Sequence, residues 1–271
     1  MLISFLFTTL PVYAGDTLLK NVSYSSVTEL IAKVPDKKIA YGDDPLQYGL
    51  LWLPEAQTPQ QKAPLVVFIH GGCWLNAFDI KHSYAATAAL AEAGYAVWSL
   101  EYRRAGDEGG GWPGSFEDIL RGIEHIDKLE NYAVDLNKVL LAGHSAGGHL
   151  ALLAGGKMPN VSGVIGLAAI SDFVTYSKGN NSCQTAGATF IGGNYSENTA
   201  AYKQANPRKQ SLHAINLLLQ GDADSIVPVT QASESIIPHV IITGAGHFDW
   251  IHPQSAAFQV FLAELNKVFF K

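Results

Sequence analysis

The stretch Gly143-His144-Ser145-Ala146-Gly147 constrains this chain more than any other, because it matches G-x-S-x-G between two apolar runs. The run before it, Lys138 to Ala142, has the composition of a short buried strand, and Gly148 to Gly155 has that of a buried helix. A serine on such a strand-to-helix turn has a strained backbone, and its small neighbours let strand and helix approach each other. The pattern therefore predicts a nucleophile elbow with the hydroxyl of Ser145 held out of a sheet.

A serine hydroxyl is a weak nucleophile near neutral pH, so chemistry at Ser145 requires a general base and an acid that orients it. Behind an elbow of this kind the acid precedes the histidine in the chain. Asp224 follows the apolar run at residues 215–220, and His247 follows the run at residues 239–243. We expect Ser145 to attack a carbonyl carbon, His247 to transfer the proton and Asp224 to hold the imidazole.

Two alternatives lie close to these residues. Asp222 precedes Asp224, but an Asp directly after a glycine usually accepts hydrogen bonds from its own turn. His252 precedes Pro253 at the start of a predicted terminal helix, whereas His247 lies in a glycine-flanked loop. We therefore prefer Asp224 and His247.

An oxyanion formed at the reacting carbon needs backbone N–H donors. The amide of Ala146 is one candidate, at the start of the helix that follows Ser145. Gly72 or Cys73 is the second, in the loop after the strand-like run at residues 64–70; the alternative is that this loop is an ordinary turn. Three further side chains are candidates for the substrate pocket: Trp74, His144 and Phe248. His144 and the nearby His149 flank the serine too closely to reach its oxygen from the side.

Strand-like and helix-like runs alternate along the chain, which predicts an α/β fold with a doubly wound, mostly parallel sheet and helices on both faces. Expected strands cover residues 48–53, 64–70, 95–101, 139–142, 161–170, 215–220 and 239–243, and expected helices cover 84–94, 115–129 with Ser115 as a cap, and 254–269. Ligands of such sheets bind at the C-terminal ends of the strands. Residues 171–212, rich in Gly, Asn and Thr, break the rhythm and are expected to form a lid or insertion after the sixth strand.

Length and composition favour one enzyme-sized domain over residues 15–271. The chain has 271 residues, of which 48% are hydrophobic and 15% charged, so a core on both sides of a sheet can form. Its net charge of −6, without a basic patch, argues against nucleic acid as a partner. No spacing of Cys and His typical of a metal site occurs, and we expect neither metal nor cofactor.

The N-terminus has the features of an export signal. Residues 1–10 form a short apolar run, and residues 12–14 give a small-x-small cleavage site that ends at Ala14. The missing positive charge before this run indicates a truncated or later start, and a first buried strand is the alternative interpretation. We expect residues 1–14 to be removed and the protein to be exported, to the periplasm or outside the cell. No other apolar run is long enough to span a bilayer, so we expect no stable membrane insertion of the mature chain.

The chain contains two cysteines, Cys73 and Cys183. In an exported protein they can form one disulfide, and two buried free thiols are the alternative. A bridge would tie the predicted lid to the loop that carries Gly72.

Several motifs together resemble the α/β-hydrolase serine esterases of the hormone-sensitive-lipase-like group, and more closely the kynurenine formamidase-like esterases. The similarity extends from about residue 40 to the end of the chain, in the motifs Tyr41-Gly42 with Pro45 and Gln47, His70-Gly71-Gly72-x-Trp74, Tyr102-Arg103 with Gly110-Gly111-Trp112-Pro113, Gly143 to Leu150, Asp224 with Val227-Pro228, and Gly246-His247-Phe248. This resemblance implies the same triad and the same oxyanion amides as the residue-by-residue interpretation.

The leading hypothesis is a serine carboxylesterase that hydrolyses small or short-chain esters through an acyl-enzyme. Within the hydrolases, the alternatives are an amidase, arylformamidase or peptidase, or a feruloyl or acetyl-sugar esterase. A remote alternative from another class is a non-catalytic binding protein with this fold. The expected partner is a small-molecule ester; the sequence leaves the oligomeric state open.

Overall fold

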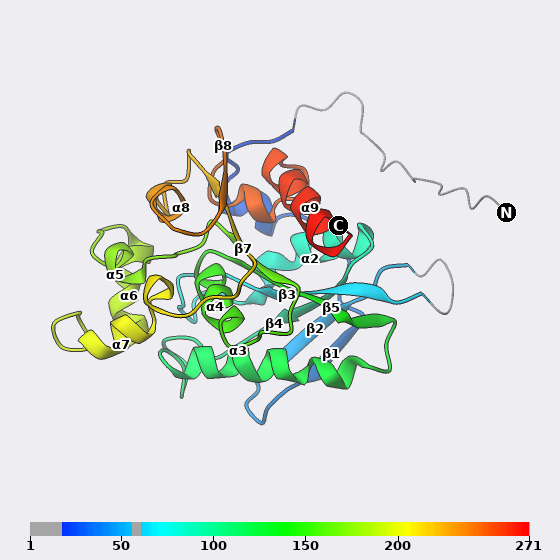
Figure 1. Ribbon diagram of the computed structural model, residues 1–271, viewed down its shortest axis with the longest axis horizontal. Helices are drawn as coiled ribbons and strands as arrows, with labels where there is room; N and C mark the ends of the chain where they lie inside the picture. Colours follow the sequence, from blue (N-terminus) through cyan, green and yellow to red (C-terminus); the bar gives the residue numbers. More distant parts are fainter. Residues whose placement is uncertain (1–17, 56–60, 271) are drawn as a thin grey trace.

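The eight strands of the described chain form one sheet at the centre of the molecule (Figure 1). The computed structural model describes residues 18–55 and 61–270. In chain order the strands are β1 (Lys37–Ala40), β2 (Tyr48–Trp52), β3 (Ala63–Ile69), β4 (Ala96–Leu100), β5 (Val134–His144), β6 (Gly163–Leu167), β7 (Asn216–Gly221) and β8 (His239–Ile242). Their order across the sheet is β1-β2-β4-β3-β5-β6-β7-β8.

In the order of the sheet, all neighbouring strands from β4 to β8 are parallel. The strand β2 is antiparallel to both of its neighbours, β1 and β4. This confirms the predicted doubly wound, mostly parallel sheet. The strand β5, which leads to Ser145, lies inside the sheet between β3 and β6. The C-terminal ends of β3, β5, β7 and β8 therefore meet at one edge of the sheet, where a ligand crevice is expected.

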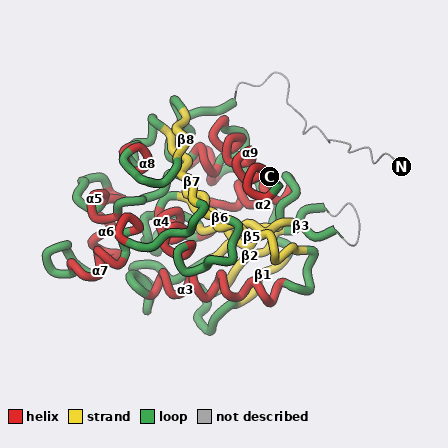
Figure 2. Tube along the Cα trace, viewed as in Figure 1, coloured by secondary structure: helices red, strands yellow, loops and turns green. Residues whose placement is uncertain are grey.

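Helices cover both faces of the sheet (Figure 2). One face packs against α2 (Tyr84–Glu92) and α9 (Ala256–Phe269), and the other packs against α3 (Gly114–Glu124) and α4 (Ala146–Gly155). Side chains of β3 alternate between the two cores: Leu65, Val67 and Ile69 point to one, and Val66 and Phe68 to the other. All are fully buried, which explains why this run is hydrophobic without alternation.

The predicted insertion at residues 171–212 contains three short helices beside the sheet. They are α5 (Phe173–Tyr176), α6 (Ser182–Ile191) and α7 (Thr199–Gln204), followed by the 3₁₀ helix η3 (Pro207–Lys209). In Figure 1 they lie together on the side of the molecule away from β1. The remaining short helices are α1 (Tyr24–Thr28), η1 (Ile80–Ser83), η2 (His125–Leu129), α8 (Thr230–Ser233) and η4 (Asp249–Ile251).

Some local predictions were wrong. The sequence did not indicate β1, an edge strand whose residues are mostly exposed. Ser115 does not cap α3, because its hydroxyl donates to the carbonyl of Arg103 at 2.6 Å and accepts the amide of Gly111 at 3.1 Å. Pro113 occupies the cap position instead. The segment after residue 124 continues as η2 and not as α-helix.

The predicted export signal at residues 1–14 lies outside the described residues. Within the described ranges, no helix combines the length and the hydrophobicity that crossing a membrane requires.

Candidate active site

Ser145 lies at the junction of β5 and α4 with φ 56° and ψ −121°, a strained backbone for a side-chain-bearing residue. The glycines around it are required by packing. A Cβ on Gly143 would lie 2.3 Å from the carbonyl oxygen of Gly147, and a Cβ on Gly147 would lie 2.1 Å from that of Ile69. The predicted elbow geometry is therefore present, with strand and helix in backbone contact.

Asp224 and His247 form a direct pair at the ends of β7 and β8. Oδ2 of Asp224 accepts a hydrogen bond from Nδ1 of His247 at 2.8 Å. Its Oδ1 accepts the amides of Ile226 and Val227, each at 2.8 Å, and Gln220 Nε2 donates to Oδ2 at 3.1 Å. The carboxylate is thus fixed by its own turn while it holds the tautomer of His247 in which Nε2 is free to accept a proton.

Asp222 has a structural role, but its hydrogen-bond partner is not in its own turn as predicted. Its Oδ1 accepts the amide of Gly244 at 2.7 Å, which joins the turns after β7 and β8. It makes no hydrogen bond to His247 among the described residues. His252, the other alternative, accepts the amide of Gln254 at 3.3 Å and is nearly buried beside α9.

Ser145 and His247 both line a pocket of about 280 Å³. In the described chain no hydrogen bond joins the hydroxyl of Ser145 to His247, and such bonds are often long in structures without substrate. His144 holds the backbone of His247 in place, because its Nε2 donates to the carbonyl of His247 at 2.9 Å. Burial, and secondly the neighbouring His247, hold the pKa of His144 well below its usual value, so His144 is a neutral donor.

The loop after β3 carries the predicted oxyanion residues Gly72 and Cys73 and is called the oxyanion loop below. Gly72, Cys73 and Trp74 have φ values of 108°, 53° and 60°. Three successive residues with positive φ turn the chain sharply beside Ser145. Within the described structure, neither the amide of Gly72 nor that of Cys73 donates a hydrogen bond to another residue, and the same holds for Ala146. These amides are available to an oxygen bound in the pocket.

His70 and Glu101 hold this loop from below. Nδ1 of His70 donates to the carbonyl of Gly71 at 2.8 Å, and its Nε2 lies 3.0 Å from Oε1 of Glu101. Oε2 of Glu101 accepts the amide of Ile80 at 3.1 Å, at the far end of the same loop. Burial raises the pKa of Glu101, but His70 and Arg104 outweigh it, so the pKa lies below its usual value. The acid is therefore an anion that fixes both ends of the loop.

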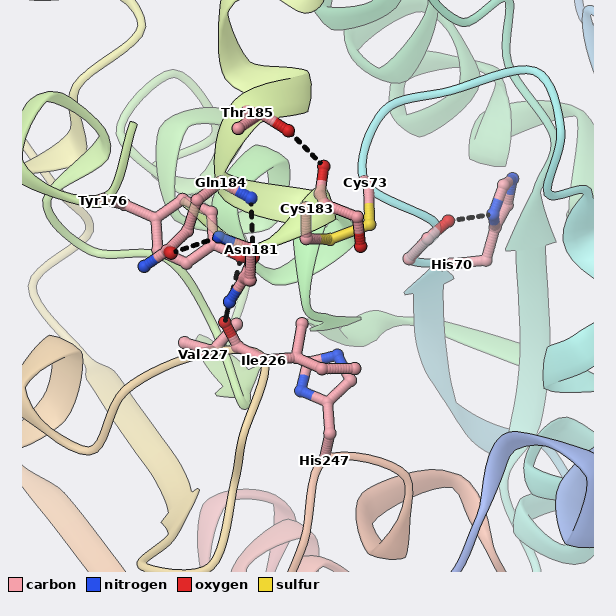
Figure 3. Close-up of a disulfide and its surroundings, with 12 residues drawn as sticks. His70, Cys73, Tyr176, Asn181, Cys183, Gln184, Thr185, Ile226, Val227 and His247 are labelled. Carbon is pink, nitrogen blue, oxygen red and sulfur yellow. Dashed lines mark hydrogen bonds between the residues drawn. A yellow bond between two sulfur atoms is a disulfide. The ribbon is translucent and has the colours of Figure 1, made fainter. Parts of the chain in front are cut away.

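A disulfide joins the oxyanion loop to the insertion (Figure 3). It links Cys73 to Cys183 in the first turn of α6, with 5.0 Å between the Cα atoms. Just before α6, Nδ2 of Asn181 donates to the carbonyl of Ile226 at 2.9 Å. The hydroxyl of Tyr176 donates to the same carbonyl at 3.2 Å. The insertion thus contacts both the oxyanion loop and the turn that carries Asp224.

Two of the three predicted pocket residues line the pocket, and one does not. His144 and Phe248 face it, whereas Trp74 is fully buried in the core. The indole of Trp74 is held in the core by two contacts. Its ring stacks on that of Phe190 with 5.2 Å between the centroids, and its Nε1 donates to Nδ1 of His149 at 3.2 Å. Trp74 supports the oxyanion loop from beneath and is not a pocket residue.

Sequence reasoning missed much of the pocket wall. The lining also includes Tyr24, Phe78, His82, Ser182 and Ile226. Two of these are aromatic residues near recognised motifs, Phe78 after the oxyanion loop and His82 in η1, just before α2. Tyr24 lies in an N-terminal polar segment without periodicity, which gave no signal.

A family model matches residues 51–236, more than half of the chain. It is described as BD-FAE. This chain belongs to the BD-FAE family. The matched range includes β3, the elbow and Asp224 and ends before His247.

Several relatives of this chain are named as esterases. The chain is 26% identical over 266 residues to esterase LipC of Mycobacterium tuberculosis, covering 85% of this chain and 65% of LipC. It is 32% identical over 137 residues to a probable mitochondrial carboxylesterase 4 of Arabidopsis thaliana, covering 42% of this chain and 36% of that one. The chain therefore spans less than two thirds of each relative's length. The crystal structure of esterase B from Lactobacillus rhamnosus superposes with a TM-score of 0.75 at 20% identity, covering 90% and 89% of the two chains, and shares the fold.

Proposed function

We propose that this protein is a serine carboxylesterase that hydrolyses small, neutral carboxylic esters through an acyl-enzyme. The observation that carries the proposal is the 2.8 Å hydrogen bond between Asp224 and His247 at the pocket that Ser145 lines. The esterase relatives support an ester substrate, and they do not favour the amidase, formamidase or peptidase alternatives.

In the proposed mechanism, Oγ of Ser145 attacks the carbonyl carbon of the ester while Nε2 of His247 removes its proton. Negative charge develops on the carbonyl oxygen. The amides of Ala146 and of Gly72 or Cys73 stabilise that charge more strongly than the neutral ground state. Asp224 stabilises the imidazolium that forms.

The tetrahedral intermediate then collapses. The imidazolium of His247 gives its proton to the leaving alcohol, and the acyl group remains on Ser145. Water attacks this acyl group next, with His247 again as the base, and releases the carboxylic acid. The pocket accepts a neutral molecule best, because none of its lining residues is Asp, Glu, Lys or Arg.

The decisive experiment compares the wild type with Ser145→Ala on p-nitrophenyl acetate and butyrate. We expect turnover by the wild type, its loss in the variant by more than about 10³-fold, and labelling of the wild type alone by a fluorophosphonate probe. Equal turnover by both proteins would reject the proposal. Aryl formamides and peptide anilides in the same assay test the amide alternatives.

We also propose that the protein works outside the cytosol. The sequence of residues 1–14 supports this, and so does the disulfide, because such bonds persist in oxidising compartments. Fractionation of cells that express the full chain, with mass spectrometry of the mature N-terminus, tests it. An intact Met1 on a cytosolic protein would contradict it.

A further inference from the structure

The N-terminal segment Leu19–Thr28 is attached to the loop that carries His247. The amides of Asn21 and Val22 donate to the two carboxylate oxygens of Asp249, each at 2.7 Å. Leu19 also donates from its amide to the carbonyl of Gln254 at 3.1 Å. In Figure 1 this dark blue segment passes between β8 and α9. Its position is therefore fixed by hydrogen bonds to a catalytic loop.

This attachment places the ring of Tyr24 on the pocket. The ring centroid lies 5.4 Å from that of Phe248, 6.0 Å from that of Phe78 and 6.0 Å from that of His82. All four residues line the same pocket as Ser145. Tyr24 lies before residue 51, where the match to the family model begins. This part of the wall therefore lies outside the matched range.

His82 is an unusual member of this group. The residue is 6% exposed, and its buried Nδ1 has no hydrogen-bond partner of good geometry among the described residues, although the backbone of Asp79 lies near the ring. Burial, and secondly the charge of His70, lower the pKa of His82 to about 3, so the ring is neutral. Four other histidines near Ser145 are at least as deeply buried, and each makes a hydrogen bond through at least one ring nitrogen: His70, His144, His149 and His247.

Buried polar side chains in proteins nearly always have a hydrogen-bond partner. An unpaired imidazole on the wall of a substrate pocket is satisfied when a ligand brings a polar group to it. A nitrogen of a neutral imidazole donates in one tautomer and accepts in the other, so a hydroxyl group, which can do either, is its best match. A purely aliphatic substrate would leave that nitrogen unsatisfied. An ionised group would have no charged partner among the lining residues.

We propose that His82, covered by the ring of Tyr24, is a specificity-determining residue that binds a hydroxyl group of the ester substrate. The inference rests on the proposed esterase function and narrows it to neutral esters with a hydroxyl group near the ester bond. The rings of Tyr24, Phe78 and Phe248 provide the apolar surface around that hydroxyl.

The test uses three esters of similar size: ethyl butyrate, 2-hydroxyethyl butyrate and ethyl 3-hydroxybutyrate. The last two add one hydroxyl on the alcohol side and on the acyl side. We expect the wild type to have a higher kcat/KM for one hydroxylated ester than for ethyl butyrate. In His82→Phe that selectivity ratio should fall about 3- to 10-fold, the range of one hydrogen bond. His82→Gln, which keeps a donor and an acceptor, should retain part of it.

Phe78→Leu is the matched control, because it alters the same wall without removing a polar atom, and it should leave the selectivity ratio in place. A second measurement does not depend on a variant of His82. In Ser145→Ala protein, the selected hydroxylated ester should shift the ring ¹⁵N resonances of His82, and ethyl butyrate should not. This measurement decides the question if His82→Phe does not fold.

The outcomes separate this inference from the proposed function. If the wild type hydrolyses ethyl butyrate without preferring either hydroxylated ester, the hydroxyl subsite is wrong and the esterase stands. An equal fall in kcat/KM for all three esters in His82→Phe would also reject the hydroxyl subsite, because His82 would then only support the fold. If the wild type hydrolyses none of the esters and the fluorophosphonate does not react, the esterase proposal itself fails.

Discussion

Cys73 and Cys183 are separated by 110 residues in the chain, yet a disulfide joins them beside the hydroxyl of Ser145. Cys73 lies in the loop whose amides face the pocket, and Cys183 lies in the first turn of α6 of the insertion. The hydrogen bond from Asn181 to Ile226 continues the connection to the turn of Asp224. The insertion is thereby coupled to two of the three loops that form the site.

We expect removal of this bridge to affect both stability and catalysis. A disulfide typically stabilises a protein by about 2–4 kcal/mol, chiefly through the unfolded chain. In the double variant Cys73→Ala/Cys183→Ala, the free energy of unfolding in urea should fall by this amount and kcat should decrease. Reductant should shift the wild type in the same direction and leave the double variant unchanged. Two free thiols in denatured, unreduced wild-type protein would contradict the bridge.

The pair Asp224 and Asp222 gives a test of roles within one turn. Asp224→Asn should leave the fold intact and lower kcat by about 10⁴-fold, because the neutral amide no longer fixes the tautomer and charge of His247. Asp222→Asn removes a carboxylate whose one hydrogen bond to the described residues is that from the amide of Gly244. It should cost about 1 kcal/mol in stability and little activity. If Asp222→Asn lowered kcat more than Asp224→Asn, Asp222 would be the acid that orients His247.

The sequence was sufficient to place Asp224 near His247. Both follow apolar runs of strand type, and parallel strands bring their C-terminal ends to one edge of a sheet. The elbow was equally accessible, because its glycines are set by local contacts between β5 and α4. Such features depend on neighbours in the chain or on strand order, and both leave a pattern in the sequence.

The pocket wall could not be predicted in the same way. Tyr24 reaches the site because backbone amides of its segment bind the carboxylate of Asp249. This contact spans more than 220 residues and uses no side chain of the segment. Trp74 was misplaced for a related reason. Its neighbours Phe173 and Phe190 come from the insertion, whose position relative to β3 no local pattern reveals.

We expect Asp249 to link the N-terminal segment to catalysis. Its carboxylate also accepts the amide of Gly246 at 3.2 Å, directly before His247. Asp249→Ala should leave three amides without this acceptor, lower the unfolding free energy by about 2–4 kcal/mol and reduce kcat/KM. The exposed Asp43, changed to Ala, is the control and should alter neither. Full activity of a stable Asp249→Ala protein would show that the segment does not position His247.

The buried His149 predicts how stability depends on pH. Its Nε2 donates to the carbonyl of Ala205 at 2.6 Å, its Nδ1 accepts from Trp74, and burial lowers its pKa from 6.5 to about 4. The unfolded chain therefore binds a proton between pH 6.5 and 4 that the folded protein does not. The contribution of the neutral His149 ring to the free energy of unfolding is fully present above pH 6.5 and is lost as the pH falls toward 4.

Between pH 7 and pH 5 this histidine alone should reduce the unfolding free energy by about 2 kcal/mol. His149→Gln offers the same donor and acceptor without a titrating group, so its loss over that interval should be smaller by this amount. The exposed His239, changed to Gln, should lose as much stability as the wild type. Urea unfolding of the three proteins at both pH values measures the difference. Equal losses of unfolding free energy in all three proteins would mean that His149 is already protonated in the folded protein.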